Sequence, residues 1–331
     1  MKDEDVANAS FYNTGSDFMP YYRAQILPQV VEFERSRIEA LKDFRTRVLM
    51  AIPLGIGLVC FGIWLAFFKL PSMFEETDPT FPLIAMALAL AGISAWCASP
   101  IQAFKTSVKQ KIYPRIFGFF QGNWVHSEKS PVSARDFDES SLIPSYDTEH
   151  KGDYVRGDYK GVPLQIHESK LTRTEGSGKN RRTVTVFQGV LVCLGSNKKF
   201  KGRTLIKRDY GFMNWAANGF QSMERIRLED PLFEKQFEVF GDDQVESRYL
   251  LTTSFMDRLL KLVTLFDAKG LQASFYDHKL LIMIPTGKNY FEASSIFKPA
   301  TFIPEINTVL EEMHAFFNII DTLKLNEKTG L

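Results

Sequence analysis

The chain has 331 residues, 40 of them basic and 39 acidic, so a global field that would attract nucleic acid is excluded and any basic binding surface must be local. Its three cysteines have no CxxC spacing, which excludes a disulfide framework and suits a reducing compartment. The length suits a membrane segment followed by one soluble domain.

Residues 1–19 are predicted to be a polar N-terminal tail, and two uncharged apolar runs follow, at about 48–68 and 81–101. The first reads VLMAIPLGIGLVCFGIWLAFF and the second FPLIAMALALAGISAWCASPI. As a helix with a rise of about 1.5 Å per residue, a run of this length spans roughly the 30 Å of a bilayer's hydrocarbon. The sequence therefore predicts two transmembrane helices.

The charges around the two spans indicate the orientation of this hairpin. Basic residues precede the first span and follow the second, whereas the connector at 69–80 has three acidic residues against one lysine. Because positive charge is retained on the cytoplasmic side, both termini are predicted to be cytoplasmic. Neither span contains an ionisable residue, which favours an anchor in the lipid bilayer over a transport path.

Within residues 20–125, both spans are predicted to continue into the cytoplasm as helices. Apolar residues at roughly helical spacing lead into the first span from Ile26 to Val48 and away from the second from Ile101 to Phe119. We hypothesise that these two extensions pair as a short antiparallel stalk.

The soluble part is predicted to be an α+β domain at residues 149–331, preceded by a linker at 126–148 that is rich in Ser, Pro, Asp and Glu. A helix at about 253–266 and a closing amphipathic helix from near Pro304 are expected, the latter packing on a largely antiparallel sheet. A pleckstrin-homology-like barrel is one form of this arrangement, by analogy. The expected strands are 153–159, 162–174, 183–194, 202–209, 237–239, 272–276 and 279–285.

A resemblance to a known family is carried by residues 228–262, which read LEDPLFEKQFEVFGDDQVESRYLLTTSFMDRLLKL. They resemble an uncharacterised bacterial family of two-span membrane proteins, the domain of unknown function numbered 3137. Residues 200–209 (FKGRTLIKRD), 280–285 (LLIMIP) and 319–325 (IIDTLKL) are similar to the same family. The resemblance implies a bacterial inner-membrane protein, and it implies no activity because the family has no assigned function.

Patterns that carry chemistry are weak. The sequence at 176–180, GSGKN, lacks the glycine spacing and the Ser or Thr of a phosphate-binding loop, and the five histidines are far apart without metal-ligand spacing. We therefore expect no catalytic residue, no metal site and no cofactor. One acidic cluster is open to two interpretations, a catalytic pair or turn caps and structural ion pairs. Its members are Glu229, Asp230, Glu234, Asp242, Asp243 and Glu246.

The most usable surface signal comes from two basic connections, at residues 181–182 and 198–201, and from an aromatic segment at 210–220. In an antiparallel meander the connections fall at opposite ends of the sheet, so they form one patch only if the sheet curls. Beside an anionic leaflet, each basic group near the surface contributes about 1 kcal/mol of attraction. The alternative is that the basic residues are solvated turn residues and the tryptophan belongs to the core. The candidate contacts with lipid or a partner are Arg181, Arg182, Lys198, Lys199, Lys201 and Trp215.

Three functions remain open. The first, which we favour, is a membrane-anchored, non-enzymatic binding or scaffolding protein that presents a cytoplasmic domain to an unknown protein partner. The second is a lipid-responsive module whose basic hairpin tips dock on anionic headgroups. The third is an enzyme that uses the acidic cluster near Asp242. Nucleic acid is not expected as a partner, because the chain is neutral and tethered to a membrane.

Overall fold

The computed structural model describes residues 18–69, 80–120, 122–196, 198, 200–208, 223–268, 270–293 and 295–325, except for the side chain of Lys179. These residues form two compact units. The helical unit contains residues 18–112 and 293–305, and the sheet unit contains residues 113–292 and 306–325. Each unit is described separately below.

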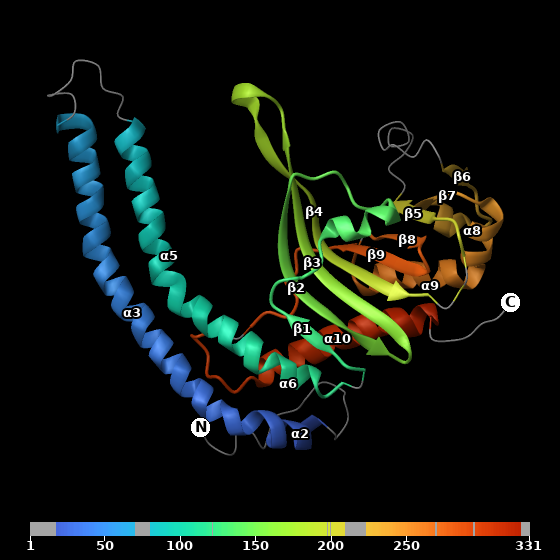
Figure 1. Cartoon of the computed structure of the whole chain (residues 1–331), viewed down its shortest axis with the longest axis horizontal. Coiled ribbons are helices and arrows are strands. Elements are labelled where there is room, and N and C mark those ends of the chain that lie inside the picture. The colour runs from blue at the N-terminus through green and yellow to red at the C-terminus, as the bar shows by residue number, and fades with distance from the viewer. Residues whose placement is uncertain are drawn as a thin grey trace. The chain divides into compact units, whose positions relative to one another are not determined.

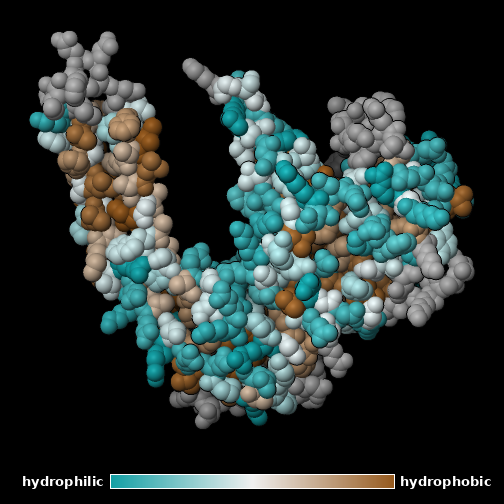
Figure 2. Space-filling model, in the orientation of Figure 1, coloured by the Kyte–Doolittle hydropathy of each residue, from teal (hydrophilic) through white to brown (hydrophobic). Residues whose placement is uncertain are grey.

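The helical unit is built on two long helices, α3 (Leu27–Trp64) and α5 (Thr80–Lys111) (Figure 1). Short helical turns flank α3, namely α2 (Phe18–Tyr21), η2 (Tyr22–Ile26) and η3 (Leu65–Lys69). Both helices are long and apolar enough to cross a membrane, and only 6% and 11% of their most apolar windows are buried. In Figure 2, apolar residues cover the end of the helix pair where α3 ends and α5 begins. A buried core helix would not leave such a surface exposed, so the two helices indicate membrane association.

The polar parts of α3 and α5 lie side by side and run antiparallel. Lys111 on α5 forms a long ion pair with Glu32 on α3 (3.9 Å), and its ammonium lies 5.9 Å from the centre of the Phe33 ring. Nearer the apolar runs, Arg47 donates a hydrogen bond to the Trp96 carbonyl at 2.9 Å and lies over the Trp96 ring. Opposite charges and cation–π contacts therefore line the helix pair outside its apolar part.

A segment from far along the chain, residues 295–302, binds the polar half of α3, and we call it the clamp. Arg37 donates a hydrogen bond to the Ile296 carbonyl (2.7 Å) and is paired with Glu34 (2.6 Å). Glu34 in turn accepts the Ala300 N–H at 2.8 Å. The aromatic pairs Phe33–Phe302 and Phe44–Phe297 and a hydrogen bond from Tyr22 to the Thr301 carbonyl complete the contact.

The sheet unit contains a nine-stranded antiparallel sheet in the order β1-β2-β3-β4-β9-β8-β5-β7-β6, which confirms the α+β class. No pairing joins β1 to β6 in the described residues, so the sheet is open and the barrel analogy is wrong. All seven expected strands are present, while β1, β6 and four short helices, at 134–140, 178–180, 231–234 and 244–250, were not expected. The strands are β1 (Val125–Ser127), β2 (Thr148–Tyr159), β3 (Val162–Glu175), β4 (Arg182–Gly195), β5 (Thr204–Arg208), β6 (Glu224–Ile226), β7 (Phe237–Gly241), β8 (Gln272–Tyr276) and β9 (Lys279–Pro285).

The helices of the sheet unit lie around this sheet, and α10 carries the longest buried stripe. On α10, Phe317 stacks on Tyr159 of β2 (4.1 Å between ring centres), and Phe316 packs on Tyr290. The closing helix therefore packs as its amphipathic pattern predicts. The helices are α6 (Tyr113–Phe117), η4 (Ala134–Ser140), η5 (Gly178–Asn180), α7 (Pro231–Glu234), α8 (Gln244–Leu250), α9 (Thr253–Leu265) and α10 (Ile303–Leu323).

The opposite face of the sheet is covered by the segment expected to be a linker. Residues 126–148 contain most of β1 and all of η4, and Ala134, Phe137 and Leu142 are buried against Leu191 and Met283. Because neighbouring strand residues point to opposite faces, Val190 and Val192 of β4 are buried on the other side. The sheet is thus covered on both faces, which explains the continuous burial of β4 from Gly189 to Leu194.

Candidate functional site

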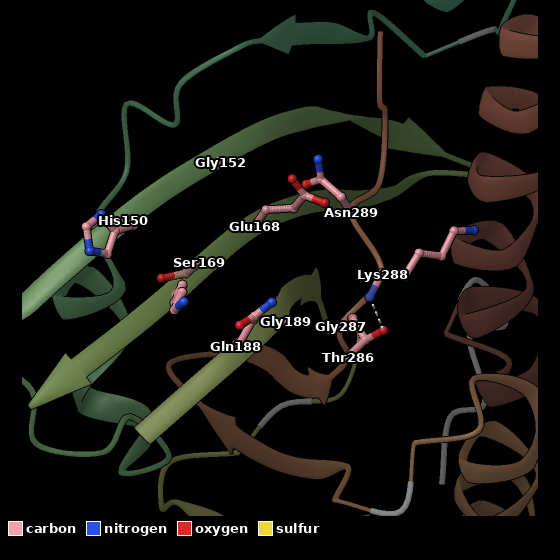
Figure 3. Close-up of a pocket in the computed structure, with 11 residues that line it drawn as sticks. His150, Gly152, Glu168, Ser169, Gln188, Gly189, Thr286, Gly287, Lys288 and Asn289 are labelled. Atoms are coloured by element: carbon pink, nitrogen blue, oxygen red, sulfur yellow. Dashed lines mark hydrogen bonds between the residues drawn. The ribbon is translucent and has the colours of Figure 1, made fainter. Parts of the chain in front are cut away.

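A polar pocket of about 200 Å³ lies where β2, β3 and β4 meet the turn that follows β9 (Figure 3). It combines side chains that carry charge or hydrogen-bonding groups with backbone that three glycines leave accessible. Its lining residues are His150, Gly152, Glu168, Ser169, Lys170, Gln188, Gly189, Thr286, Gly287, Lys288 and Asn289.

Gly189 and the turn after β9 shape this pocket. Gly189 has φ = +155°, and a Cβ at this position would lie 2.1 Å from the Ile284 carbonyl oxygen. Only glycine therefore lets β4 approach β9 so closely here. The turn then begins with Thr286, whose N–H donates to the Gln188 carbonyl (3.0 Å) and whose hydroxyl accepts the Lys288 N–H (3.0 Å).

Two buried glutamates hold the chain on the far side of the turn. Glu168 of β3 accepts the Tyr290 N–H at 2.5 Å and the Asp153 N–H at 3.3 Å. Glu312 of α10 accepts the Phe291 N–H at 2.8 Å and forms an ion pair with Lys288 at 3.1 Å. Burial raises the pKa of the Glu312 carboxyl group above its ordinary value. These bonds fix the path of the turn between the sheet and α10.

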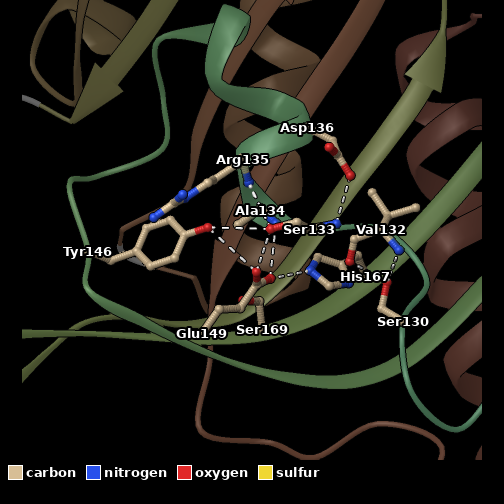
Figure 4. Close-up of polar contacts among 10 residues, drawn as sticks. All are labelled: Ser130, Val132, Ser133, Ala134, Arg135, Asp136, Tyr146, Glu149, His167 and Ser169. Carbon is tan, nitrogen blue, oxygen red and sulfur yellow. Dashed lines mark hydrogen bonds and ion pairs between the residues drawn. The ribbon is translucent and has the colours of Figure 1, made fainter.

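On the other face of the sheet, Glu149 is the centre of a buried polar cluster (Figure 4). One carboxylate oxygen accepts the Ala134 N–H (3.0 Å) and faces His167 Nε2 (3.0 Å), and the other accepts the Ser133 hydroxyl (2.7 Å). Burial opposes ionisation of Glu149, but hydrogen bonds from Ser133 and Ala134 outweigh it and lower the pKa of this carboxyl group. Burial also lowers the pKa of His167. The cluster fastens the segment before β2 to the sheet.

The first predicted contact residues, Arg181 and Arg182, lie at the start of β4, at the tip of the β3–β4 hairpin. This end of the hairpin extends beyond its neighbours, since β2 pairs with β3 only as far as Thr172 and β9 pairs with β4 only as far as Gly189. Arg181 is exposed, whereas Arg182 shares Glu175 with Arg173 in an exposed ion-pair network.

The second predicted group follows the other end of β4, so the structure does not bring the two groups together. Lys201 is exposed. Lys198 is half-buried, with its ammonium 5.0 Å from the centre of the Tyr249 ring, and burial lowers its pKa. Lys199 and Trp215 lie outside the described residues.

The acidic cluster binds the backbone of the basic connection at residues 201–203 and caps two helices. Glu246 accepts the N–H groups of Lys201 and Gly202 at 2.7 Å each, and Asp242 binds both the N–H and the guanidinium of Arg203. Four further acidic contacts are local to helix starts, because Asp230 accepts the Leu232 and Phe233 N–H groups and Asp243 those of Val245 and Glu246. This matches the interpretation as caps and structural ion pairs.

Sequence reasoning missed the pocket and the Glu149 cluster. For the pocket, the one local signal is a glycine inside an otherwise β-branched strand, at position 189, which marks a close backbone approach. The cluster has no local signal, since Glu149 and His167 meet only through the register of β2 and β3. No group of three or more His, Cys, Asp or Glu in the described part of the chain is arranged to hold a metal ion.

Comparisons with known proteins give one family. Residues 185–325 match the model of the family described as "Protein of unknown function (DUF3137)", which confirms the resemblance for that part of the chain. No curated protein matches the sequence. Among solved structures, the mycobacterial trehalose monomycolate transport factor A, TtfA, is similar at 9% identity and a TM-score of 0.35, over 65% of this chain and 94% of that one. At this similarity nothing is carried over from that protein.

Proposed function

We propose that this chain, whose residues 185–325 carry a domain of the DUF3137 family, is a membrane-anchored binding or scaffolding protein without catalytic activity of its own. Its two apolar helices anchor it in a bacterial inner membrane with both termini in the cytoplasm, where the sheet unit meets a protein partner. The observation that carries the proposal is the continuity of α3, which runs unbroken from Leu27 to Trp64. The apolar span and the part bound by the clamp are therefore one element.

The exposed surface of this element supports the anchor. Side chains such as Leu49, Ile56 and Phe61 are more than half exposed, although each would gain about 1.5–3 kcal/mol from leaving water. In a bilayer the same side chains lie in hydrocarbon. A soluble helix would instead bury them against its own protein.

Membrane orientation is tested by labelling single cysteines in whole cells with a membrane-impermeant maleimide, after the three native cysteines have been replaced by alanine. Glu76→Cys in the connector is expected to be labelled from outside, and the exposed Lys129→Cys in the sheet unit only after the cells are opened. Labelling of Lys129→Cys in intact cells would exclude a cytoplasmic sheet unit.

The binding role is tested by cross-linking the full-length chain in native membranes and quantifying what is recovered by mass spectrometry. A partner that is enriched reproducibly, and that cross-links to the sheet unit, is the expected result. A matched membrane protein with two spans and another cytoplasmic domain is the control. Repeated failure to enrich any partner over that control counts against the proposal.

The lipid-responsive alternative remains a second proposal because of one observation, the projecting hairpin end that carries the exposed Arg181. In it the contacts are Arg181, Arg182, Lys198, Lys199, Lys201 and Trp215. Two features weaken it, since Arg182 is paired with Glu175 and Lys198 packs on Tyr249. A surface charge that already has a partner attracts an anionic leaflet less.

A further inference from the structure

We propose that the pocket between β2–β4 and the turn after β9 binds the phosphoryl group of a small ligand. This inference rests on the proposed binding role and gives it a ligand class. It follows from the hydrogen-bonding groups that line the pocket, because two backbone N–H groups and two basic side chains there have no partner among the described residues.

The backbone of the turn supplies the first donors. The N–H groups of Lys288, Tyr290 and Phe291 are bound to Thr286, Glu168 and Glu312, respectively. The N–H groups of Gly287 and Asn289, which alternate with them, have no acceptor in the described part of the chain. Backbone N–H groups that line a concave turn are a recurrent way to hold an oxyanion.

Side chains add positive charge to the same lining. Lys170 and His150 are exposed at the pocket, and neither side chain has an ion pair or hydrogen bond among the described residues. Figure 3 shows His150 on β2, across the pocket from the turn after β9. A lysine ammonium is a common phosphate ligand, which it binds as a point charge.

The carboxylate that lines the pocket, that of Glu168, is already engaged. Glu168 is buried and holds two backbone N–H groups, and Glu312 holds Phe291 and the ammonium of Lys288. A cationic ligand would therefore find its natural partners occupied, whereas an anion finds unoccupied donors. These donors are exposed to solvent at the pocket, so a ligand rich in acceptors is the complementary one.

The pocket has room for a ligand larger than a water molecule. Its volume of about 200 Å³ is several times the roughly 30 Å³ that a water molecule occupies in the liquid. A phosphoryl group with a short organic chain fits such a space. The phosphoryl group could belong to a soluble phosphomonoester or to a lipid headgroup, and both would present the same oxygens to the turn.

The first test is isothermal titration of the full-length protein in neutral detergent with glycerol 3-phosphate, at constant ionic strength. Binding is expected for the native chain and for the control Lys235→Gln, which removes an exposed lysine elsewhere on the sheet unit. Lys170→Gln is expected to weaken binding about tenfold or more, since a hydrogen bond to a charged group is lost. No binding by the native chain, or equal affinity of Lys170→Gln and Lys235→Gln, overturns the proposal.

A second variant, Gly287→Ala, is chosen because it changes the pocket without disturbing the fold. Gly287→Ala adds a methyl group where no heavy atom lies within 4 Å, so the fold is expected to be retained. Because the residue lines the pocket, the affinity for glycerol 3-phosphate is expected to fall while the melting temperature stays the same. Unchanged affinity with unchanged melting would place the ligand outside this pocket and overturn the assignment.

The source of the phosphoryl group is distinguished in nanodiscs of phosphatidylcholine with or without phosphatidic acid. If phosphatidic acid weakens glycerol 3-phosphate binding by competition, and Lys170→Gln abolishes that effect, the ligand is a lipid headgroup. If affinity is the same in both nanodiscs, the ligand is soluble. A chain that does not bind glycerol 3-phosphate but shows the expected cysteine labelling would contradict this inference alone. An unexpected labelling pattern would contradict the proposed anchor.

Discussion

At the scale of single residues, buried carboxylates carry much of the structure that local sequence does not encode. Glu149, Glu168 and Glu312 each accept backbone N–H groups from segments far away in the sequence. A buried charge is tolerated only when hydrogen bonds replace its lost hydration. These three residues therefore act as attachment points for irregular chain, and their loss costs more than the loss of an exposed carboxylate.

Gly189→Ala is expected to destabilise the sheet unit by about 1–3 kcal/mol or more, from its backbone conformation alone. The added Cβ would also lie 2.1 Å from the Ile284 carbonyl, so β4 and β9 would have to separate. Thermal unfolding of the detergent-solubilised chain measures the effect. Gly287→Ala is the matched control because its methyl group meets open space. Equal melting temperatures for the two variants would contradict this account of Gly189.

The buried side chain of His167 is expected to make the free energy of unfolding depend on pH. Burial lowers the pKa of His167 in the folded chain, so below its ordinary value of about 6.5 the unfolded chain binds a proton that the folded chain does not. This contribution therefore destabilises the fold as the pH falls through that range. His167→Gln, which can still donate to Glu149, is expected to flatten the loss of stability between about pH 7.5 and 5.5.

The measurement is the free energy of unfolding at several pH values for the native chain, His167→Gln and the control His150→Gln, whose side chain is exposed. Comparing slopes removes the contributions of other titrating groups, such as the buried Glu312. A slope for His167→Gln that equals that of the native chain would show that this histidine does not titrate differently on unfolding.

At the scale of elements, the clamp shows how one irregular segment can bind a helix through its backbone. Arg37 and Glu34, one turn apart on α3, form an ion pair with each other and reach the Ile296 carbonyl and the Ala300 N–H. The hydrogen bond from Arg37 is the main cause of the lowered pKa of Glu34. An irregular segment has backbone groups outside any helix or sheet, and charged side chains satisfy two of them here.

Arg37→Ala is expected to release the clamp locally, because it removes the bond to Ile296 and leaves Glu34 without its partner. The cost is about 1–3 kcal/mol, which raises hydrogen exchange of the amides in residues 295–302 by roughly 5- to 100-fold. Exchange followed by mass spectrometry on the full-length chain measures it. Arg35→Ala, two residues away and exposed, is the control. Equal exchange in both variants would mean that Arg37 does not hold the clamp.

At the scale of the whole molecule, the described chain passes between the helical unit and the sheet unit three times, at residues 112–113, 292–293 and 305–306. The clamp lies between two of these crossings. Residues 293–305 therefore belong to the helical unit, although they lie far along the chain from α3 and α5.

The lipid-responsive proposal belongs to this scale, since it concerns how the sheet unit meets a membrane surface. In nanodiscs, an environment-sensitive dye at the exposed position of Thr183→Cys, in a background without the native cysteines, is expected to shift with anionic lipid and to revert with salt if the hairpin end docks. Neutralising Arg181 and Arg182 should remove the shift, and neutralising Lys235 should not. A dye signal that ignores both lipid charge and salt would end this proposal.

The sequence by itself determined the two apolar spans, most of the strands, α9 and the closing helix α10. These depend on periodicity and composition over short stretches, which the chain carries locally. The irregular segments were misjudged for the same reason, because the supposed linker at 126–148 packs through Ala134 and Phe137 on strands that lie far along the chain. Local composition cannot distinguish a loose loop from one that is held by distant partners.

Only the tertiary structure decided where the candidate site lies. The pocket needs β2, β3 and β4 beside the turn after β9, and the Glu149 cluster needs the register of β2 on β3. The two basic connections were expected at opposite ends of the sheet, and β4 does separate them. Which charges remain available was not predictable, since Asp242 meets Arg203, and Glu246 the backbone N–H of Lys201, only through the fold. Sequence order fixes spacing along the chain, whereas pairing of strands fixes which groups meet.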